Sequence, residues 1–347
     1  MKNRSQPMRD EFPRRGKRQE LKGEELSRYV QSLFEKRGRT AFESARKAIM
    51  EEANKLGSER IREAFTYLLS YWTDTTRPAL LSMACEAVGG DPEGTKLVAA
   101  PLVLICEAVD IHDDIIDQSI TKGDHLTVYG KFGKEIAMLV GDALLFKGFA
   151  ILLAAEKEMP NNKMETIMQS IRKSFFELGD AEVLELAFRN RTDVKVEDYL
   201  AVVRKKASDV EAYLRISAIV GNASPEETEA LAKYGRILGM LIILGDDNFD
   251  MLHPMEMINR VENESLPLPM LYALQDPSLR ARLAPILAKK RISKKDASTI
   301  LSLVYSAGIF SDVGIYLRKL INEGTESLKH IRNRESLRAI IESTYPE

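Results

Sequence analysis

The sequence predicts an all-α protein, and three observations support this prediction. From residue 24 onward, apolar residues recur at the three- and four-residue spacing that places them on one face of a helix. No run alternates between apolar and polar residues in the way that a half-buried strand does. Clusters of glycine, proline and asparagine divide the chain into helix-length segments. Because no linker separates these segments, we expect residues 23–347 to form a single all-helical domain.

The first 22 residues differ from the rest of the chain in composition. Residues 1–22 hold eight Lys or Arg, three Asp or Glu and two Pro, with almost no apolar periodicity. Such a segment buries too little apolar surface to offset the entropy of ordering it, so we expect a disordered basic tail. Over the whole chain, 50 Lys and Arg nearly cancel 52 Asp and Glu, a balance that does not suggest nucleic-acid binding.

The helical segments follow one another with recognisable ends. In residues 58–72 the apolar residues fall at i, i+4, i+7, i+8 and i+11, and residues 195–221 carry a similar pattern. Ser224 and Glu227 form a capping box with Pro225 at the first helical position, so a helix is expected to begin there. The other long helical patterns cover residues 93–118, 133–157, 163–190 and 226–250.

Cysteine usage and hydropathy bear on the location of the protein. Cys85 and Cys106 lie in apolar runs without a partner at metal-ligand spacing, which favours buried thiols in a reducing compartment. No apolar run reaches the ~18 residues of a membrane span, and no signal peptide is visible. We therefore expect a cytoplasmic protein without a transmembrane segment.

Two aspartate triplets carry the strongest chemical signal in the chain. Each reads Asp-Asp-x-x-Asp and ends a long apolar helical pattern. The first triplet consists of Asp113, Asp114 and Asp117, and the second triplet of Asp246, Asp247 and Asp250. Carboxylates at i and i+4 share a helix face, where a like-charged pair costs a few tenths of a kcal/mol. Negative charge at a helix C-terminus also opposes the helix dipole.

A divalent cation would remove both costs. Hard oxygen ligands suit Mg²⁺, which usually takes one or two carboxylates and completes its shell with water and phosphate oxygens. Two triplets that face each other would hold several Mg²⁺ ions around a diphosphate, and we expect three. The ions would neutralise the diphosphate as it leaves an allylic prenyl group. All six aspartates are therefore predicted to be metal ligands and catalytic residues.

Around these triplets the chain resembles the trans-isoprenyl diphosphate synthases, the polyprenyl synthetase family. The resemblance spans residues 58–275, and its blocks besides the triplets are residues 61–64, 77–81, 84–92, 131–133, 141–145 and 268–274. It implies an isoprenoid-synthase-type bundle of antiparallel helices around a deep central cavity, and a homodimer. It also implies a Mg²⁺-dependent prenyltransferase that condenses an allylic prenyl diphosphate with isopentenyl diphosphate.

The residues that bind isopentenyl diphosphate in this family are largely missing here. Where the family has Gly-Gly-Lys-Arg-x-Arg-Pro, residues 72–78 keep only Arg77, and Asp74 replaces the lysine. The Arg-Arg-Gly that follows the first triplet in the family keeps one basic residue, Lys122. The resemblance implies Arg77, Lys122 and Lys206 as the remaining phosphate contacts, with Lys206 also catalytic. Each lost charge-assisted contact is worth ~1.5–3 kcal/mol, so this substrate site is degenerate.

Three functions are open at this point. The first is a prenyl diphosphate synthase that uses isopentenyl diphosphate as acceptor. The second keeps the ionisation step but not that acceptor, as in a terpene cyclase, a phosphohydrolase-like enzyme or a prenyltransferase to a different acceptor. The third is a non-catalytic regulatory subunit, although such a subunit has no reason to tolerate the repulsion within both triplets.

The resemblance also implies which residues set product length and line the cavity. Ala108 and Val109 lie five and four residues before the first triplet, where bulky side chains limit the product in this family. Both lack an aromatic ring, so we expect products of C20 or longer. Glu182 and Glu185 stand where the family has Gln and Asp facing the cavity. Asp110 occupies a helix position that is normally apolar, and the sequence offers no reason for it.

Overall fold

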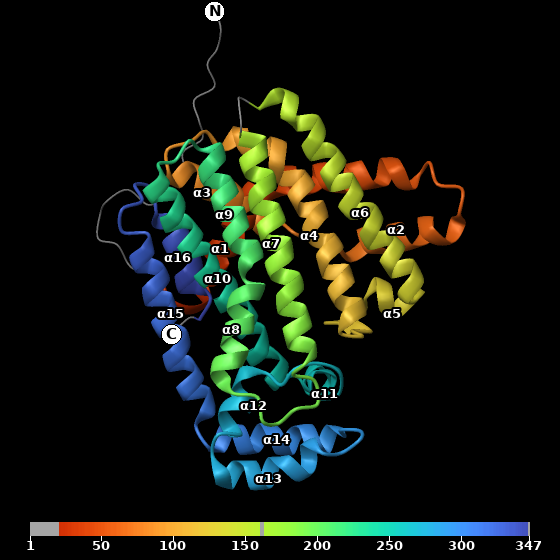
Figure 1. Cartoon of the computed structure of the whole chain (residues 1–347), viewed down its shortest axis with the longest axis vertical. Helices are drawn as coiled ribbons and strands as arrows, with labels where there is room; N and C mark the ends of the chain where they lie inside the picture. The colour runs from red at the N-terminus through yellow and green to blue at the C-terminus, as the bar shows by residue number, and fades with distance from the viewer. Residues whose placement is uncertain (1–20, 160–162, 346–347) are drawn as a thin grey trace, which may run out of the picture.

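The computed structural model describes residues 21–159 and 163–345, and every long element in it is a helix (Figure 1). The predicted basic tail lies outside these residues except for its last two positions. The elements of the first half are α1 (Gly23–Ala53), α2 (Glu59–Tyr71), α3 (Thr76–Ala87), η1 (Pro92–Thr95), α4 (Lys96–Ile116), α5 (Val128–Phe132), α6 (Lys134–Ala155), η2 (Glu156–Glu158) and α7 (Lys163–Leu186). Those of the second half are α8 (Val196–Lys206), α9 (Ser208–Val220), α10 (Pro225–Leu252), α11 (Pro254–Asn263), α12 (Leu268–Ala273), α13 (Pro277–Leu287), α14 (Lys294–Ser306), α15 (Ile309–Ser327) and α16 (Glu335–Ser343). The fold is all-α, as the apolar periodicity predicted.

Helix α4 runs through the interior of the bundle. It packs along α6, while α7 packs along α9 and α9 along α10 (Figure 1). Every residue of α4 from Val98 to Ala108 is buried, a pattern typical of a helix that is covered on all sides. One apolar cluster extends from α1 to α16, and a second fills the space between α1, α2, α4 and α6. Helix α4 contributes to both clusters, so its C-terminal end is held rigidly.

Local signals explain where α10 begins and why α8 and α9 are separate. Ser224 accepts a hydrogen bond from the backbone N–H of Glu227, whose carboxylate accepts one from the N–H of Ser224, which confirms the predicted capping box. Residues 195–221, which read as one helical pattern, form two helices that meet at Ala207. At this position α10 approaches closely, because a Cβ on Gly239 would lie 2.8 Å from the Cβ of Ala207. Apolar spacing continues across the bend, so the pattern alone did not reveal it.

A small hairpin follows the first triplet. Strands β1 (Thr121–Lys122) and β2 (His125–Leu126) pair antiparallel, with Lys122 opposite His125. Gly123 in the turn has a φ of 58°, a conformation that glycine adopts at little cost. The sequence analysis predicted no strand, because a two-residue strand is too short to show alternation. The hairpin matters for the site because it carries Lys122.

Helix α6 has one buried and one exposed apolar side. The segment Lys134–Glu158 has the length and, with a mean hydropathy of 2.0, the composition of a membrane span, and 33% of that window is buried. This differs from the sequence analysis, which counted uninterrupted apolar runs. One side of α6 packs along α4, whereas Phe146 and Leu153 are exposed by 75% and 60%. A large exposed apolar face on a helix that also joins the core is typical of a surface that another molecule covers.

Candidate functional site

The first triplet forms the C-terminal turn of α4. Asp117 is the C-cap residue, and its carboxylate accepts a hydrogen bond of 2.8 Å from Nη2 of Arg189, which also donates to the carbonyl of Ile116. The carboxylates of Asp113 and Asp114 accept no hydrogen bond from the part of the chain that the structure describes. His112 beside them lies 3.2 Å from Asp142 through Nε2. Two of the three carboxylates are therefore open to a ligand.

The second triplet lies in the last two turns of α10, and its members have unequal surroundings. Asp247 is only 1% exposed and accepts hydrogen bonds from the hydroxyl of Tyr199 at 2.8 Å and from the backbone N–H of Leu268 at 3.0 Å. The guanidinium of Arg260 also pairs with Asp247, and its Nε lies 3.5 Å from the carboxylate of Asp250. Asp246 accepts no hydrogen bond from the described residues. Asp247 thus joins α10 to α8, α11 and the start of α12.

The two triplets border the same space. Burial alone would lower the pKa of Lys122, but neighbouring carboxylates, among them Asp110, Asp114 and Asp113, raise it. The same lysine acts on Asp246 of the second triplet, where it opposes the upward shift caused by burial. The charge of Lys122, on the exposed hairpin, thus acts on carboxyl groups of both triplets.

Desolvation changes the acidity of the whole group. It raises the pKa of Asp246 to about 6, of Asp114 and Asp250 to about 7 and of Asp117 to about 8. It also raises the pKa of Asp113 and Asp247. Burial disfavours the ionised form of a carboxyl group, and the like charges of the other members add to this effect. A cation in this space would offset both the desolvation of the carboxylates and the repulsion between them.

The carboxylate oxygens of the triplets suit Mg²⁺ ions that also bind a substrate. Within the described ranges, no three His, Cys, Asp or Glu side chains converge closely enough to enclose a metal ion by themselves. Mg²⁺ does not need such a cage, since it is usually bound by one or two carboxylates plus phosphate oxygens and water. Asp113, Asp114 and Asp246 provide oxygens that no described protein group uses. The residues are therefore suited to metal ions that a diphosphate completes.

Lys206 at the end of α8 faces the first triplet from the other side. Its ammonium group lies 2.6 Å from Glu185 and 3.0 Å from Glu182, both on α7. Burial alone would raise the pKa of Glu185, but the charge of Lys206 outweighs this effect, and the pKa of Glu185 is lowered. For Glu182 burial dominates and raises the pKa to about 7. Asp113 is another carboxylate whose charge acts on Lys206. The two glutamates that the resemblance placed on the cavity thus hold this lysine in position.

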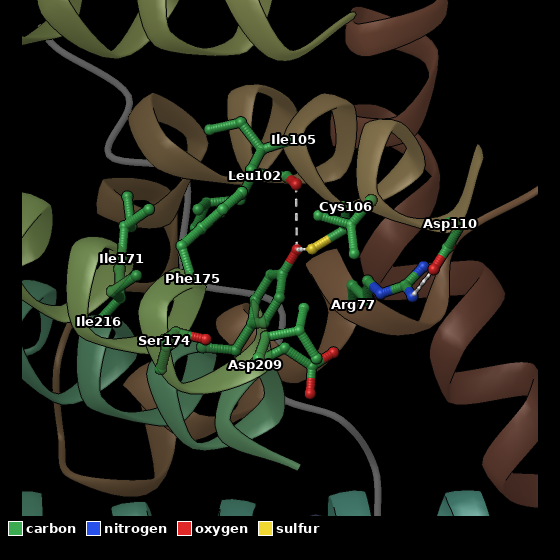
Figure 2. A pocket seen from close by; sticks show the side chains of 14 residues that line it. Arg77, Leu102, Ile105, Cys106, Asp110, Ile171, Ser174, Phe175, Asp209 and Ile216 are labelled. Atoms are coloured by element: carbon green, nitrogen blue, oxygen red, sulfur yellow. Dashed lines mark hydrogen bonds and ion pairs between the residues drawn. The ribbon is translucent and has the colours of Figure 1, made fainter. Parts of the chain in front are cut away.

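Arg77, the basic residue that survives from the family motif, is fully engaged within the protein. Its Nη1 donates to Asp74 at 3.0 Å. Its Nη2 donates to Asp110 at 3.2 Å, as Figure 2 shows. Asp74 also accepts a hydrogen bond of 3.1 Å from the backbone N–H of Arg77. This arrangement accounts for Asp110, for which the sequence offered no reason. The residue that replaced the family lysine and the unusual helix residue together neutralise the remaining arginine.

An apolar cavity lies beside the first triplet, between α4, α7 and α9. Arg77 and Asp110 lie at one end of it and Ile171 and Ile216 at the other (Figure 2). The remaining lining residues are Leu102, Ile105, Cys106, Val109, Ser174, Phe175, Leu178, Asp209, Ala212 and Tyr213. Of the two residues predicted to set product length, Val109 lines this cavity. Ala108 does not, because it is fully buried in the second apolar cluster.

Three polar residues of the site were missed by the sequence analysis. Arg189, Tyr199 and Arg260 contact the triplets from the segment after α7, from α8 and from α11. They lie 72, 48 and 13 residues from the aspartates that they bind. No motif spacing marks Arg189 or Tyr199. The one available signal was the position of Arg260, a basic residue in the short segment between the second triplet and the 268–274 block.

The fold and the site together define a class. An all-α bundle with two Asp-Asp-x-x-Asp triplets around one space, next to an apolar cavity, is an isoprenoid-synthase-type protein. Within this class, a sequence model of the polyprenyl synthetase family matches residues 58–304, which is more than half of the chain. The chain belongs to this family, and it is a prenyltransferase of isoprenoid biosynthesis. The match covers the predicted resemblance and extends it by almost thirty residues.

Individual relatives agree with this membership. A short chain isoprenyl diphosphate synthase of Methanothermobacter thermautotrophicus is 30% identical over 266 residues, covering 76% of this chain and 78% of the relative. A geranylgeranyl diphosphate synthase of Methanosarcina mazei is 34% identical over 209 residues, covering 60% of this chain and 64% of the relative. The crystal structure of geranylgeranyl pyrophosphate synthetase from Pyrococcus horikoshii has a TM-score of 0.76 at 24% identity, covering 91% of this chain and 99% of that one. The last comparison bears on the fold alone.

Proposed function

We propose that this protein binds an allylic prenyl diphosphate together with Mg²⁺ between the two triplets, ionises it and transfers the prenyl group. The observation that carries the proposal is the set of six triplet carboxyl groups whose pKa burial raises, three of which no described protein group uses. Their side chains are those of Asp113, Asp114, Asp117, Asp246, Asp247 and Asp250. We expect three Mg²⁺ ions with the bound diphosphate, which would supply the positive charge that stabilises the leaving group.

The protein's own residues position the donor. Asp113, Asp114 and Asp246 present free oxygens to the space, whereas Asp247 anchors α10 through Tyr199 and Arg260. Lys206, kept in place by two glutamates, directs its ammonium group toward the first triplet and acts there on a diphosphate oxygen. Since the cavity opens beside the same turn of α4, the prenyl tail lies in it with Val109 in its wall. Because Val109 lacks an aromatic ring, we expect products of C20 or longer.

Two acceptors are candidates. Isopentenyl diphosphate is the first, because the relatives are named isoprenyl and geranylgeranyl diphosphate synthases. Arg77, Lys122 and Lys206 would then supply its phosphate contacts. A different acceptor is the second, and the pairing of Arg77 with Asp74 and Asp110 favours it. The synthase names of the relatives lend no support to a cyclase, a phosphohydrolase-like enzyme or a regulatory subunit.

We further propose that the protein is cytoplasmic and forms a homodimer. Apolar side chains are exposed along α6 and α7, with Phe176 and Val183 of α7 exposed by 78% and 66%. The ring centroids of Phe149 and Phe175 lie 6.3 Å apart and join the two helices, so the exposed face is continuous with that of α6. A second copy of the chain would cover it.

The mass in solution tests the homodimer. Light scattering should give twice the chain mass, and Phe176→Asp should yield monomers, whereas a monomeric wild type would contradict the homodimer. The cytoplasmic location is supported by two buried free cysteines.

One incubation tests the central proposal. Purified protein is mixed with Mg²⁺ and geranyl, farnesyl or geranylgeranyl diphosphate, with and without isopentenyl diphosphate, and pyrophosphate and products are measured. We expect Mg²⁺-dependent release of pyrophosphate from at least one donor. Elongated diphosphates would favour isopentenyl diphosphate as the acceptor, and release without elongation would favour another acceptor. Absence of release with all donors at all Mg²⁺ concentrations would contradict the proposed function.

A further inference from the structure

The lining of the apolar cavity follows successive turns of α4 and α9. On α4, Val109, Cys106 and Leu102 recur at three- and four-residue spacing and so lie on one face of the helix. On α9, Tyr213 and Ile216 have the same spacing. Val109 lies one turn before the first triplet, and Cys106 and Leu102 lie further from it. A prenyl tail that enters the cavity beside the triplet therefore passes Val109 before it reaches the other turns.

Tyr213 crosses this cavity from α9 to α4. Its hydroxyl donates a hydrogen bond of 3.0 Å to the carbonyl of Leu102 and lies 2.7 Å from Sγ of Cys106. Because both partners belong to α4, the ring spans the gap between the two helices. Figure 2 shows these hydrogen bonds between the end of the cavity that holds Arg77 and the end that holds Ile171. The ring thus stands between the triplet end of the cavity and its far end.

The ring of Tyr213 is held firmly in this position. Tyr213 is only 4% exposed, and its partners Leu102 and Cys106 are buried as well. A buried hydroxyl that left these partners would find no water to replace them, so the hydrogen bonds resist a swing of the ring. Val109, by contrast, has a short aliphatic side chain. The ring of Tyr213 is therefore a fixed obstacle that a tail meets beyond Val109.

The length of the tail can be compared with the position of this obstacle. At 1.5 Å per residue, Cys106 and Leu102 lie ~10.5 Å and ~16.5 Å along α4 from Asp113. One isoprene unit has four chain bonds and spans ~5 Å, somewhat more than the 3.8 Å that three bonds span between neighbouring Cα atoms. Three units, or ~15 Å, reach the level of the ring, whereas four units, or ~20 Å, pass it.

Resting on the proposed donor chemistry, we propose that Tyr213 determines the length of the prenyl chain. Its ring stops the donor tail in the middle of the cavity, so farnesyl diphosphate is the longest donor that fits and C20 is the longest product. Tyr213 contacts the tail and not the reacting atoms, so its role is in specificity. Loss of the ring would join the triplet end to the far end at Ile171 and Ile216, and would admit a fourth unit.

A series of donors tests this inference on the wild-type protein. The full chain is incubated with Mg²⁺, isopentenyl diphosphate and geranyl, farnesyl or geranylgeranyl diphosphate. Pyrophosphate release is measured, because it reports use of the donor whichever acceptor reacts. We expect kcat/KM to be at least about tenfold lower for geranylgeranyl than for farnesyl diphosphate, since extra carbons do not fit a packed space. Equal values would overturn the inference, whereas no release with any donor would contradict the donor chemistry itself.

Two variants of Tyr213 separate the bulk of the ring from its hydrogen bonds. Tyr213→Leu removes the ring and should bring kcat/KM for geranylgeranyl diphosphate to within about threefold of that for farnesyl diphosphate. Tyr213→Phe keeps the ring and should keep the wild-type preference. A preference for farnesyl diphosphate that persists in folded Tyr213→Leu would overturn the inference.

Tyr234→Leu is the matched control. Tyr234 is fully buried, and its hydroxyl donates a hydrogen bond of 2.7 Å to the carbonyl of Leu337, so the variant loses a comparable ring and bond away from the cavity. We expect it to keep the wild-type preference, and circular dichroism melting checks the fold of each variant. A change of preference in Tyr234→Leu equal to that in Tyr213→Leu would count against a specific role. The wild-type donor series decides the inference even if Tyr213→Leu does not fold.

Discussion

The first triplet and Asp110, the partner of Arg77, lie on adjacent turns of α4, but the charges at the two triplets and around Arg77 are arranged differently. At the triplets, Asp113, Asp114 and Asp246 have no described protein partner, and the nearest cations are outnumbered. Around Arg77, the guanidinium is saturated by Asp74 and Asp110. One side of the site has negative charge that requires cations from outside. The other side has positive charge that is already used.

This difference reflects the two ways in which a protein can bind a diphosphate, through metal ions or through its own basic side chains. A metal-bound diphosphate needs carboxylates, and the positive charge arrives with the ions. A diphosphate bound without metal depends on the protein's own Lys and Arg side chains, and each is lost when a neighbouring carboxylate captures it. The chain has both triplets for the first kind of site, whereas Arg77, one of the residues implied for the second kind, is paired with Asp74 and Asp110. Donor and acceptor chemistry can therefore be tested separately.

Removing one donor-side carboxylate is expected to have the largest effect. Asp114→Asn takes a ligand oxygen from the metal-bound diphosphate and should lower kcat for pyrophosphate release by about 10²–10³-fold, as for other groups that stabilise transition-state charge. The rate is measured over a range of Mg²⁺ concentrations. Asp124→Asn in the exposed hairpin turn is the control, with the same change of residue. A loss of less than about threefold would mean that Asp114 does not bind the metal–diphosphate group.

Within the second triplet, Asp247 should have a structural role, whereas Asp246 should act as a metal ligand. Asp247 is buried and accepts hydrogen bonds from Tyr199 and Leu268, so Asp247→Ala leaves buried donors without an acceptor and should cost about 1–3 kcal/mol in the free energy of unfolding. Asp246→Ala removes a partly solvated carboxylate without a partner and should stay within about 0.5 kcal/mol. Urea unfolding of the metal-free variants measures both. Equal effects in the two variants would contradict the anchoring role of Asp247.

The helical elements could be predicted because their signals are local. Apolar spacing and the capping box at Ser224 depend on residues within one or two turns, and the structure confirms them. The bend at Ala207 and the hairpin around Gly123 could not be predicted in this way. The bend coincides with a close approach to Gly239, which is distant in sequence. The hairpin is too short for any periodicity to appear.

The site follows the same division. Each triplet is a contiguous motif, so its residues could be named from the sequence. The state of Arg77 could not, because it depends on Asp110, which is 33 residues away. Arg189 lies 72 residues from the aspartate that it binds, and Tyr199 lies 48 residues from its own. Charge pairs of this kind appear only when the fold brings helices together.

Restoring basic charge near Arg77 should have an intermediate effect. The double variant Asp74→Lys with Asp110→Leu releases the guanidinium and returns a lysine to the family position. Two recovered charge-assisted contacts should tighten isopentenyl diphosphate binding by at least about tenfold. Titration calorimetry measures the Kd, and Glu323→Lys serves as a remote charge control. An unchanged Kd in a correctly folded variant would show that capture of Arg77 is not what weakens this site.

The smallest expected effect is a pH dependence of the metal-free protein. Desolvation places the pKa of four triplet carboxyls at about 6 to 8, whereas an unfolded aspartate titrates near ~3.9. Between these values the folded chain binds more protons than the unfolded chain, so stability falls as pH rises through this window. We expect Tm in a chelating buffer to decrease by a few degrees from about pH 5 to about pH 8.

The triplet carboxyls should contribute to this slope together with Glu182, whose pKa burial raises to about 7. Asp117→Asn removes the carboxyl with the highest pKa of the four and should flatten the upper part of the curve, whereas Asp124→Asn should leave it unchanged. Mg²⁺ with pyrophosphate should restore more of the Tm at pH 8 than at pH 6, because metal and protons compete for the same oxygens. A Tm that rises with pH in the chelating buffer would indicate that these carboxylates are compensated within the protein, as those around Arg77 are.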